Sequence, residues 1–275
     1  MSLATAERLA LRDLAERAAR RAGDHLRRRF GNAGAIGLKG AIDLVTEADH
    51  EAEQLVVETI RRERPADAVL AEERGAEGAG ARVRWIIDPL DGTTNFARSF
   101  PLFAVSVGVE VESELAAGAV HVPMLGEMFT AARGGGATLD GRPLRVSAVD
   151  RLERSFLATG FPYDIRSNPD NNLDHFARFS VRALAIRRPG AAAADLAYLA
   201  CGRFDGFWEL RLKPWDLAAG ALLITEAGGR ITGLDGSPFR LESPGVCASN
   251  GLIHEEMLAV LVMNEAVSGG PSASG

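Results

Sequence analysis

The chain has 275 residues, of which 47% are hydrophobic and 25% charged, so it can bury a large core without disulfides or a structural metal. Its formal net charge of −6 argues against unaided binding to nucleic acid or to an anionic membrane. Cys201 and Cys247 form no CxxC pattern, which fits a reducing cytoplasm. No segment approaches the roughly 20 apolar residues of a membrane helix, and the N-terminus lacks a signal peptide's apolar core. We expect a cytoplasmic protein, built as one large α/β domain or two closely packed lobes.

The first part of the chain carries two helical patterns around a glycine-rich segment. Leucines and alanines recur at helical spacing in the first pattern, with arginines between them. The second pattern opens with Thr46 followed by Asp49, a helix-start signal, and stops at Pro65. We predict helices over residues 4–30 and 47–64 and a loop over residues 31–40.

Short apolar runs followed by acidic residues indicate buried strands that deliver carboxylates at their ends. One run precedes Glu72 and Glu73, and the next precedes Asp88 and Pro89. Three longer runs with short turns between them predict an antiparallel meander. The expected strands cover residues 68–71, 83–87, 103–111, 114–122 and 127–133.

The second half alternates between strand and helix patterns. Pro214 stands where proline is preferred in a first helical turn, and two glycines follow that helix. The expected strands cover residues 155–160, 184–188, 203–209, 231 and 246–248, and the expected helices cover residues 171–183, 191–201, 214–227 and 253–263. We divide the chain into an N-terminal lobe (residues 1–150), a C-terminal α/β lobe (residues 151–264) and a disordered tail (residues 265–275).

The strongest chemical signal is the segment Asp88-Pro-Leu-Asp-Gly-Thr-Thr-Asn95. Two carboxylates that crowd a strand end repel each other unless cations neutralise them, and hard oxygen ligands suit Mg²⁺. Gly92 lets backbone N–H groups approach an anion closely, and the Thr-Thr-Asn segment predicts a short helix that favours phosphate. By itself the segment also fits a surface turn, so the interpretation depends on other acidic residues.

Two such residues lie elsewhere in the sequence. Glu72 follows the preceding strand, and Asp216 opens a helix far downstream. Asp216 alone is also typical of an ordinary acidic residue in a first helical turn. A strand-end glutamate, a strand-end aspartate pair and a helix-start aspartate together predict a metal site.

With these residues, the sequence resembles the inositol monophosphatase family of Mg²⁺-dependent, Li⁺-sensitive phosphatases. The first family signature matches Asp88-Pro-Leu-Asp-Gly-Thr-Thr-Asn-Phe96, and the second matches Trp215-Asp-Leu-Ala-Ala-Gly220. Residues 43–49 and 71–73 also match, and the order and spacing agree from about residue 39 to residue 236. The stretch from Ile186 to Asp216 looks like the bacterial inositol-1-monophosphatase branch.

The resemblance implies an αβαβα layered sandwich, as in fructose-1,6-bisphosphatase, and a homodimer. It implies two to three Mg²⁺ ions per site. By matched position, Glu72, Asp88 and the carbonyl of Leu90 hold the first ion. Asp88, Asp91 and Asp216 hold the second, and Glu72 helps to place a weaker third ion.

The same matching assigns roles around the substrate. Asp49 and Thr93 orient the attacking water, and Glu72 takes part in catalysis. The backbone of Gly92 and Thr93 holds phosphate oxygens, and Asp91 lies beside the substrate. The hydroxyl groups of a phosphorylated polyol contact a group that consists of Gly190, Ala191, Ala192 and Glu209. Lys39 matches a loop lysine near the metals.

Several alternatives remain open from the sequence. Histidinol phosphate and fructose 1,6-bisphosphate are possible substrates, because catalytic metals do not read the leaving alcohol. A binding role is a different class of function, since some bacterial relatives assist transcription complexes. The arginines at residues 27–29 and 187–188 would serve such a partner. No His/Cys or Ser/His arrangement suggests a covalent mechanism.

Overall fold

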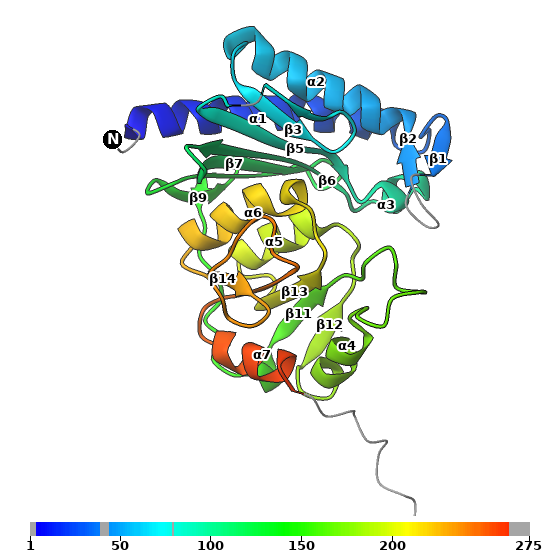
Figure 1. Ribbon diagram of the computed structural model, residues 1–275, viewed down its shortest axis with the longest axis vertical. Coiled ribbons are helices and arrows are strands. Elements are labelled where there is room, and N and C mark those ends of the chain that lie inside the picture. Colours follow the sequence, from blue (N-terminus) through cyan, green and yellow to red (C-terminus); the bar gives the residue numbers. More distant parts are fainter. Residues whose placement is uncertain (1–3, 39–43, 79, 264–275) are drawn as a thin grey trace, which may run out of the picture.

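The computed structural model describes residues 4–38, 44–78 and 80–263, and it shows alternating layers of helix and sheet (Figure 1). Two helices cover the outer face of an eight-stranded sheet, two lie between the sheets, and two cover the far face of a five-stranded sheet. These pairs are α1 (Thr5–Arg29) with α2 (Glu47–Glu63), α5 (Ala192–Ala200) with α6 (Pro214–Glu226), and α4 (Leu173–Ser180) with α7 (His254–Leu261). The αβαβα sandwich is therefore confirmed.

The eight-stranded sheet has the order β10-β9-β8-β7-β6-β5-β3-β4. Strands β3 and β5 pair in parallel, and the other pairs are antiparallel. The predicted meander is confirmed in its central strands. The strands are β3 (Ala68–Ala71), β4 (Gly75–Glu77), β5 (Val83–Asp91), β6 (Ala104–Val111), β7 (Glu114–Val122), β8 (Glu127–Ala132), β9 (Gly136–Leu139) and β10 (Arg142–Pro143).

The five-stranded sheet has the order β12-β11-β13-β15-β14. Strand β11 pairs in parallel with both β12 and β13, whereas β15 pairs antiparallel with β13 and β14. Its strands are β11 (Phe156–Thr159), β12 (Ala185–Arg187), β13 (Gly206–Leu210), β14 (Arg230–Gly233) and β15 (Gly245–Ser249). A short 3-10 helix, Leu152–Arg154, precedes β11. The division into lobes at residue 150 stays a prediction.

Some predicted boundaries were wrong. Strand β5 does not stop at residue 87 but continues to Asp91, with an irregular register between Asp88 and Asp91. The glycine-rich segment is not all loop, because β1 (Ile36–Leu38) pairs with β2 (Leu44–Thr46). The turn at residues 134–136 leads into the unpredicted strand β9, and β4 and β10 were also missed. Lys39 and the tail at 265–275 lie outside the described residues.

The middle layer packs closely because small residues lie where its helices meet the sheet and each other. A methyl group added at Gly108 on β6 would lie 2.4 Å from Cβ of Ala218 on α6. One at Gly118 on β7 would lie 3.0 Å from Cα of Ala219. Within the layer, a methyl group at Gly220 would lie 2.6 Å from Cβ of Leu196 on α5. Helix α6 therefore lies directly on the sheet, which brings its first turn close to the end of β5.

This layer covers the inner face of the eight-stranded sheet. Its core joins Ile86, Val120 and Phe129 of the sheet to Leu196 of α5 and Leu223 of α6. The sheet face thus obtains its cover from a segment that lies more than a hundred residues later than β5. No helix in the described part of the chain is both long and apolar enough to span a membrane.

We predict that Gly108→Ala lowers the free energy of unfolding by about 1–3 kcal/mol, because the added methyl group overpacks the contact with Ala218. Urea-induced unfolding would measure the change. Gly135→Ala is the matched control, since its methyl group would meet nothing closer than 3.3 Å. Equal stability of the two variants would contradict the proposed close contact.

Candidate active site

The end of β5 and the short helix after it form the centre of the site. Gly92 has a φ of 93°, which is the left-handed region that favours glycine. A Cβ there would lie 3.2 Å from the carbonyl oxygen of Gly190 and 3.3 Å from that of Leu102. A side chain at this position would therefore strain the turn from Asp91 into α3 (Thr93–Ala97).

Asp49 is held rigidly at the start of α2. Its Oδ2 accepts hydrogen bonds from the backbone N–H of Thr46 (2.8 Å) and from the Thr46 hydroxyl (2.6 Å). Its Oδ1 accepts the hydroxyl of Thr93 at 2.9 Å, and the same hydroxyl lies 3.0 Å from the carbonyl oxygen of Leu90. The predicted Asp49–Thr93 pair is therefore joined directly. Burial raises the pKa of Asp49, although its hydrogen bonds oppose that shift.

Asp91 connects the end of β5 to the start of α5. Its Oδ1 accepts the N–H of Ala192 at 3.1 Å, and its Oδ2 accepts the N–H of Ala193 at 2.8 Å. These N–H groups have no partner inside the helix, and the positive end of the helix dipole favours a carboxylate there. The two amides hold the Asp91 side chain in place.

Asp216 lies in the first turn of α6, as predicted. Its Oδ2 accepts the backbone N–H of Lys213 at 2.7 Å, which caps the helix. The carbonyl of Trp215 accepts the hydroxyl of Ser106 on β6 at 3.1 Å, so this turn is anchored to the large sheet. Glu72 directly follows β3, the parallel neighbour of β5. The structure therefore brings the four predicted carboxylates from three segments to one place.

The electrostatics of this cluster are unfavourable without a counter-ion. Burial raises the pKa of Asp88 well above its usual range, and the charges of Glu72, Asp91 and Asp216 raise it further. Burial likewise raises the pKa of Asp91 to about 7 and that of Asp216 to about 8. Amide donors oppose these shifts only in part. The cluster therefore lacks positive charge, which is the condition that bound cations would relieve.

The donor set fits a hard cation such as Mg²⁺, because it consists of carboxylates and the Leu90 carbonyl. Within residues 4–38, 44–78 and 80–263, no three or more His, Cys, Asp or Glu side chains already stand in a coordinating arrangement. Asp91 and Asp216 direct oxygens to backbone amides instead. Binding of a metal would require these carboxylates to turn or to use their remaining lone pairs.

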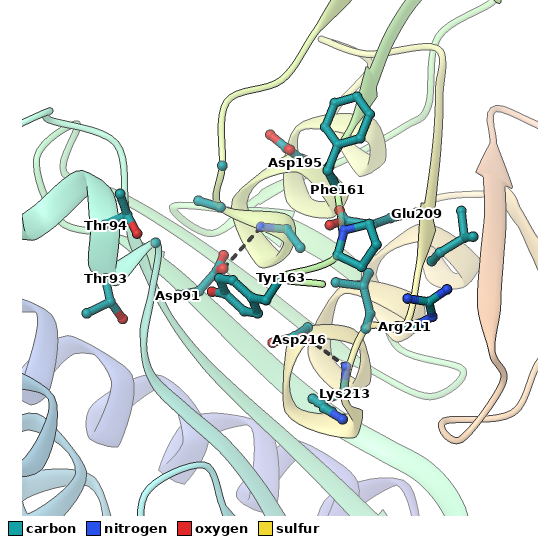
Figure 2. Close-up of a pocket in the computed structure, with 18 of the residues that line it drawn as sticks. Asp91, Thr93, Thr94, Phe161, Tyr163, Asp195, Glu209, Arg211, Lys213 and Asp216 are labelled. Atoms are coloured by element: carbon teal, nitrogen blue, oxygen red, sulfur yellow. Dashed lines mark hydrogen bonds between the residues drawn. The ribbon is translucent and has the colours of Figure 1, made fainter. Parts of the chain in front are cut away.

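A pocket of about 770 Å³ opens above the carboxylates. Figure 2 shows Asp91 with its bond to the start of α5, and Asp216 with its bond to Lys213. The pocket is lined by every predicted metal ligand and by the predicted substrate-contact residues Gly92, Thr93, Gly190, Ala191, Ala192 and Glu209. Among the predicted site residues, Asp49 does not line the pocket and contacts it only through its hydrogen bond with Thr93.

Comparison with known proteins decides the family. The model of the inositol monophosphatase family matches residues 8–266. The chain belongs to the inositol monophosphatase family. It is therefore a phosphatase, as predicted, and the expected fold of that family agrees with the observed layers.

Individual members of the family are similar over most of their length. An inositol-1-monophosphatase of Synechocystis is 43% identical over 251 residues, which cover 90% of this chain and 88% of that protein. A protein of Escherichia coli named Nus factor SuhB is 40% identical over 250 residues, 90% of this chain and 94% of that one. The solved inositol monophosphatase of Anabaena superposes with a TM-score of 0.86 at 40% identity, covering 94% of this chain and 98% of that chain.

Within this inositol monophosphatase fold, Asn95 joins the two halves of the site. Its Nδ2 lies 2.8 Å from the carbonyl oxygen of Leu102 and 2.9 Å from that of Pro189. The backbone before α5 is thereby tied to the segment after β5. Asn95 was predicted only as part of a motif, and an amide side chain next to a tight turn is a signal for such a bridge.

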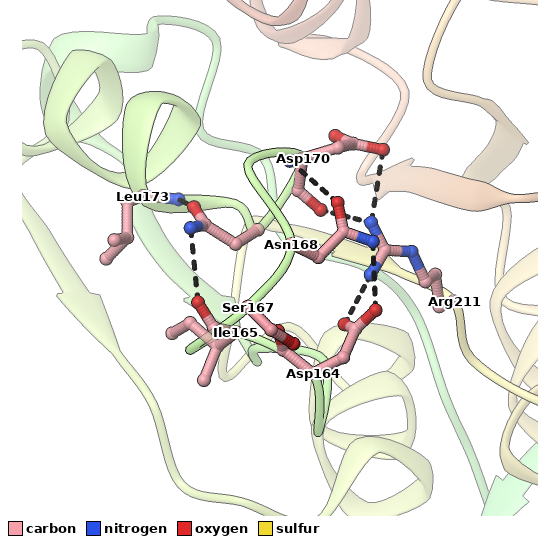
Figure 3. A network of polar contacts seen from close by, with 8 residues as sticks. Asp164, Ile165, Ser167, Asn168, Asp170, Leu173 and Arg211 are labelled. Atoms are coloured by element: carbon pink, nitrogen blue, oxygen red, sulfur yellow. Dashed lines mark hydrogen bonds and ion pairs between the residues drawn. The ribbon is translucent and has the colours of Figure 1, made fainter.

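The rim of the pocket was not predicted at all. Figure 3 shows Arg211, which follows β13, bound to a loop that precedes α4. Its guanidinium donates to the Asp164 carboxylate and to the backbone carbonyl and carboxylate of Asp170. Arg211 adopts a φ of 59°, which is strained for a residue with a side chain. This strained conformation aims the side chain at the loop that carries Phe161 and Tyr163.

We predict that the metal-free phosphatase loses stability as the pH rises from about 4 to about 8. The pKa of Asp216 is raised to about 8 in the folded protein, so folding favours its protonated form, and that contribution disappears as the pH reaches the raised pKa. Thermal unfolding in a chelator would measure the melting temperature over this pH range. The melting temperature of Asp216→Asn should fall less with pH than that of the wild type.

The control for this measurement is Asp13→Asn on the exposed face of α1. Mg²⁺ should restore more stability to the wild type at high pH than at low pH, because more of the carboxylates are then charged. A melting temperature that rises steadily with pH in chelator, or parallel curves for wild type and Asp216→Asn, would contradict the electrostatic analysis.

Proposed function

We propose that this protein uses Mg²⁺ to hydrolyse a small phosphate monoester, with myo-inositol 1-phosphate as the substrate and inositol and phosphate as the products. The observation that carries the proposal is a group of four acidic side chains that line one pocket, Glu72, Asp88, Asp91 and Asp216, in which burial and neighbouring acids raise the pKa of the three aspartates. Relatives named inositol-1-monophosphatase at 42–43% identity support the choice of substrate.

The metal ligands would divide as the sequence suggests. Glu72, Asp88 and the Leu90 carbonyl would hold one Mg²⁺, and Asp88, Asp91 and Asp216 a second, with Glu72 helping to place a third. When bound, Mg²⁺ supplies charge neutralisation for the phosphate and lowers the pKa of a coordinated water.

The chain's own residues would position the attacking water. The Thr93 hydroxyl donates to Asp49, so its oxygen lone pairs are left to accept a hydrogen bond from water. Asp49 cannot turn away, because Thr46 holds its second oxygen with two hydrogen bonds. Thr93 therefore acts as a fixed acceptor rather than as a nucleophile, and the water would attack in line without a phospho-enzyme.

The phosphate and the alcohol would lie at opposite ends of the pocket. The backbone N–H groups of Gly92 and Thr93 would hold phosphate oxygens, since Gly92 has no side chain to obstruct them. Glu209, with Gly190 and Ala191, would face the alcohol. Ala192 already donates its N–H to Asp91, so we propose that it contributes only shape to this end of the pocket.

We expect Asp91→Asn to reduce Mg²⁺-dependent phosphate release at least about a hundredfold, because it removes a charged ligand from the metal site and leaves the fold intact. A colorimetric assay of phosphate release from myo-inositol 1-phosphate would measure the loss. Asp13→Asn is the control for a remote change of charge. Near-normal Mg²⁺-dependent turnover by Asp91→Asn would refute the metal assignment.

The substrate itself needs a panel, because the metals do not distinguish the leaving alcohol. Phosphate release should be compared for myo-inositol 1-phosphate, histidinol phosphate, fructose 1,6-bisphosphate and phosphoadenosine phosphate. We expect the highest kcat/KM for the inositol ester. A higher kcat/KM for any other compound would assign that compound as the substrate and would still support the phosphatase activity.

A second role is suggested by the relatives named Nus factor SuhB, which are 40–44% identical to this chain. We propose it as an additional role that does not need catalysis. Of the two arginine groups considered for a partner, the first is partly neutralised, since Arg29 pairs with Glu47 and Glu51. In the second, Arg187 and Arg188 stack on Phe156 and Phe161.

Cells whose own copy carries Asp91→Asn would separate the two roles. Persistence of the cellular phenotype of the wild type in that strain would support a non-catalytic role, and its loss would assign the phenotype to hydrolysis.

We also propose, from the family resemblance, that the protein is a cytoplasmic homodimer inhibited by Li⁺.

A further inference from the structure

One buried acid in the pocket has no role in the reaction described above. Asp195 lies in the first half of α5, is only 1% exposed and lines the pocket. Its Oδ1 is buried and has no hydrogen-bond partner in the described structure. Because a buried carboxyl oxygen without a partner is costly, its position points to a ligand atom or a water that would complete it.

Asp195 shares its end of the pocket with Glu209, the last residue but one of β13. Burial raises the pKa of Asp195, and the charges of Asp91 and then Glu209 raise it further, so Glu209 lies within electrostatic reach of Asp195. Figure 2 shows both on the side of the pocket away from Thr93. This end of the pocket therefore offers two carboxyl groups rather than one.

Glu209 is fixed in its place by its neighbours. A methyl group at Gly160 would lie 2.0 Å from Oε1 of Glu209, so the carboxyl group occupies the space that a side chain would fill. Asn172 holds both flanks of this contact, because it donates to the carbonyl of Gly160 at 2.6 Å and accepts Nε1–H of Trp208 at 2.7 Å. The residues on both sides of the Glu209 carboxyl group are thus held in place.

The two buried acids at this end favour hydroxyl groups over anions, although Arg188 also lines the pocket. Arg188 is a cation that acts on both acids, but it stands 5.9 Å over the ring of Phe161 and is exposed. Burial raises the pKa of both carboxyl groups well above the usual range. Carboxyl oxygens accept hydrogen bonds from hydroxyl groups, whereas a second phosphate would bring them only further acceptor oxygens.

We propose that Asp195 is a specificity residue that works with Glu209 to hydrogen-bond two hydroxyl groups of the leaving alcohol, so that the pocket selects a neutral polyol phosphate. The inference rests on the proposed phosphatase function and adds a residue to it. Asp195 makes no contact with the reacting phosphorus in this arrangement, so it contributes to discrimination between alcohols and leaves the chemistry at the metals unchanged.

A purely structural role for Asp195 would have a different signature. An acid in the first turns of a helix also interacts favourably with the helix dipole. If that were its whole role, its replacement would weaken turnover of every substrate alike. A role in selection changes only the ratio between a substrate with hydroxyl groups on its alcohol and one without them.

The experiment compares myo-inositol 1-phosphate with 4-nitrophenyl phosphate, whose alcohol carries no further hydroxyl group. The variants are Asp195→Leu, which removes hydrogen bonding at similar size, and Asp195→Asn, which keeps an acceptor and a donor. Tyr198→Phe is the matched control, since its hydroxyl is also buried on α5 but does not line the pocket. Mg²⁺-loaded full-length protein is used, and kcat and KM are measured for both esters.

We expect Asp195→Leu to lower the ratio of the two kcat/KM values, inositol ester over nitrophenyl ester, by roughly tenfold, mainly through a higher KM for the inositol ester. Asp195→Asn should retain most of the ratio, and Tyr198→Phe should retain all of it. If thermal unfolding shows that Asp195→Leu does not fold, Asp195→Ala takes its place in the same comparison, and the same roughly tenfold loss of the ratio is expected.

The outcomes separate this inference from the proposed function. Wild type that hydrolyses both esters, with a ratio unchanged in Asp195→Leu, overturns the inference and leaves the proposed phosphatase function in place. Equal losses of kcat/KM on both esters would assign Asp195 a structural role and would also overturn the inference. Wild type without Mg²⁺-dependent release from either ester overturns both proposals.

Discussion

Mutual repulsion between buried carboxylates is the constraint on which the site depends. Asp88 lies among three other acids, and the group that opposes their effect on its pKa is the backbone amide of Leu90. Asp91 and Asp216 likewise rely on amide donors at the starts of α5 and α6. Such amides stabilise a carboxylate by only a fraction of what an adjacent cation supplies. The fold thus concentrates negative charge, which the proposed divalent ions would neutralise.

The packing of the middle layer makes that concentration possible. Asp216 reaches the end of β5 because α6 lies on strands that present Gly108 and Gly118 instead of larger residues. Asn95 and Asp91 then connect α3 and β5 to the start of α5. Each of these contacts joins residues about 90 or more positions apart in the chain. Catalytic geometry in this protein therefore depends on long-range packing rather than on a single local motif.

Much of the fold and most of the site could be predicted from the sequence, because long periodic segments and closely spaced motif residues carry strong signals. The helix containing Asp216 and the capping pair Thr46–Asp49 were predicted correctly. The irregular register at Asp88 was missed, because a strand that continues past a proline cannot be distinguished from one that stops before it. Strands of two to four residues, such as β10 and β9, carry too few residues for a period to appear.

The missed pocket residues have a common reason. Asp195 lies in an alanine-rich helix, where one acid is typical of a solvent-facing position, and only its burial shows otherwise. Arg211 looked like an ordinary charged residue after a strand, since its contacts with Asp164 and Asp170 lie more than forty positions away. The burial of Asp195 and the partners of Arg211 both depend on distant parts of the chain, so no short stretch of sequence reveals them. Roles that depend on burial or on distant partners require the folded chain.

The order in which the layers occur along the chain has a consequence for biosynthesis. The inner face of the eight-stranded sheet consists of apolar residues such as Val120 and Phe129, and its cover comes from α5 and α6. A nascent polypeptide therefore leaves the ribosome with a complete sheet whose apolar face has nothing to pack on until α6 has been translated. Throughout that interval the emerging chain presents a surface to which molecular chaperones bind. Productive folding is thus expected to be largely post-translational.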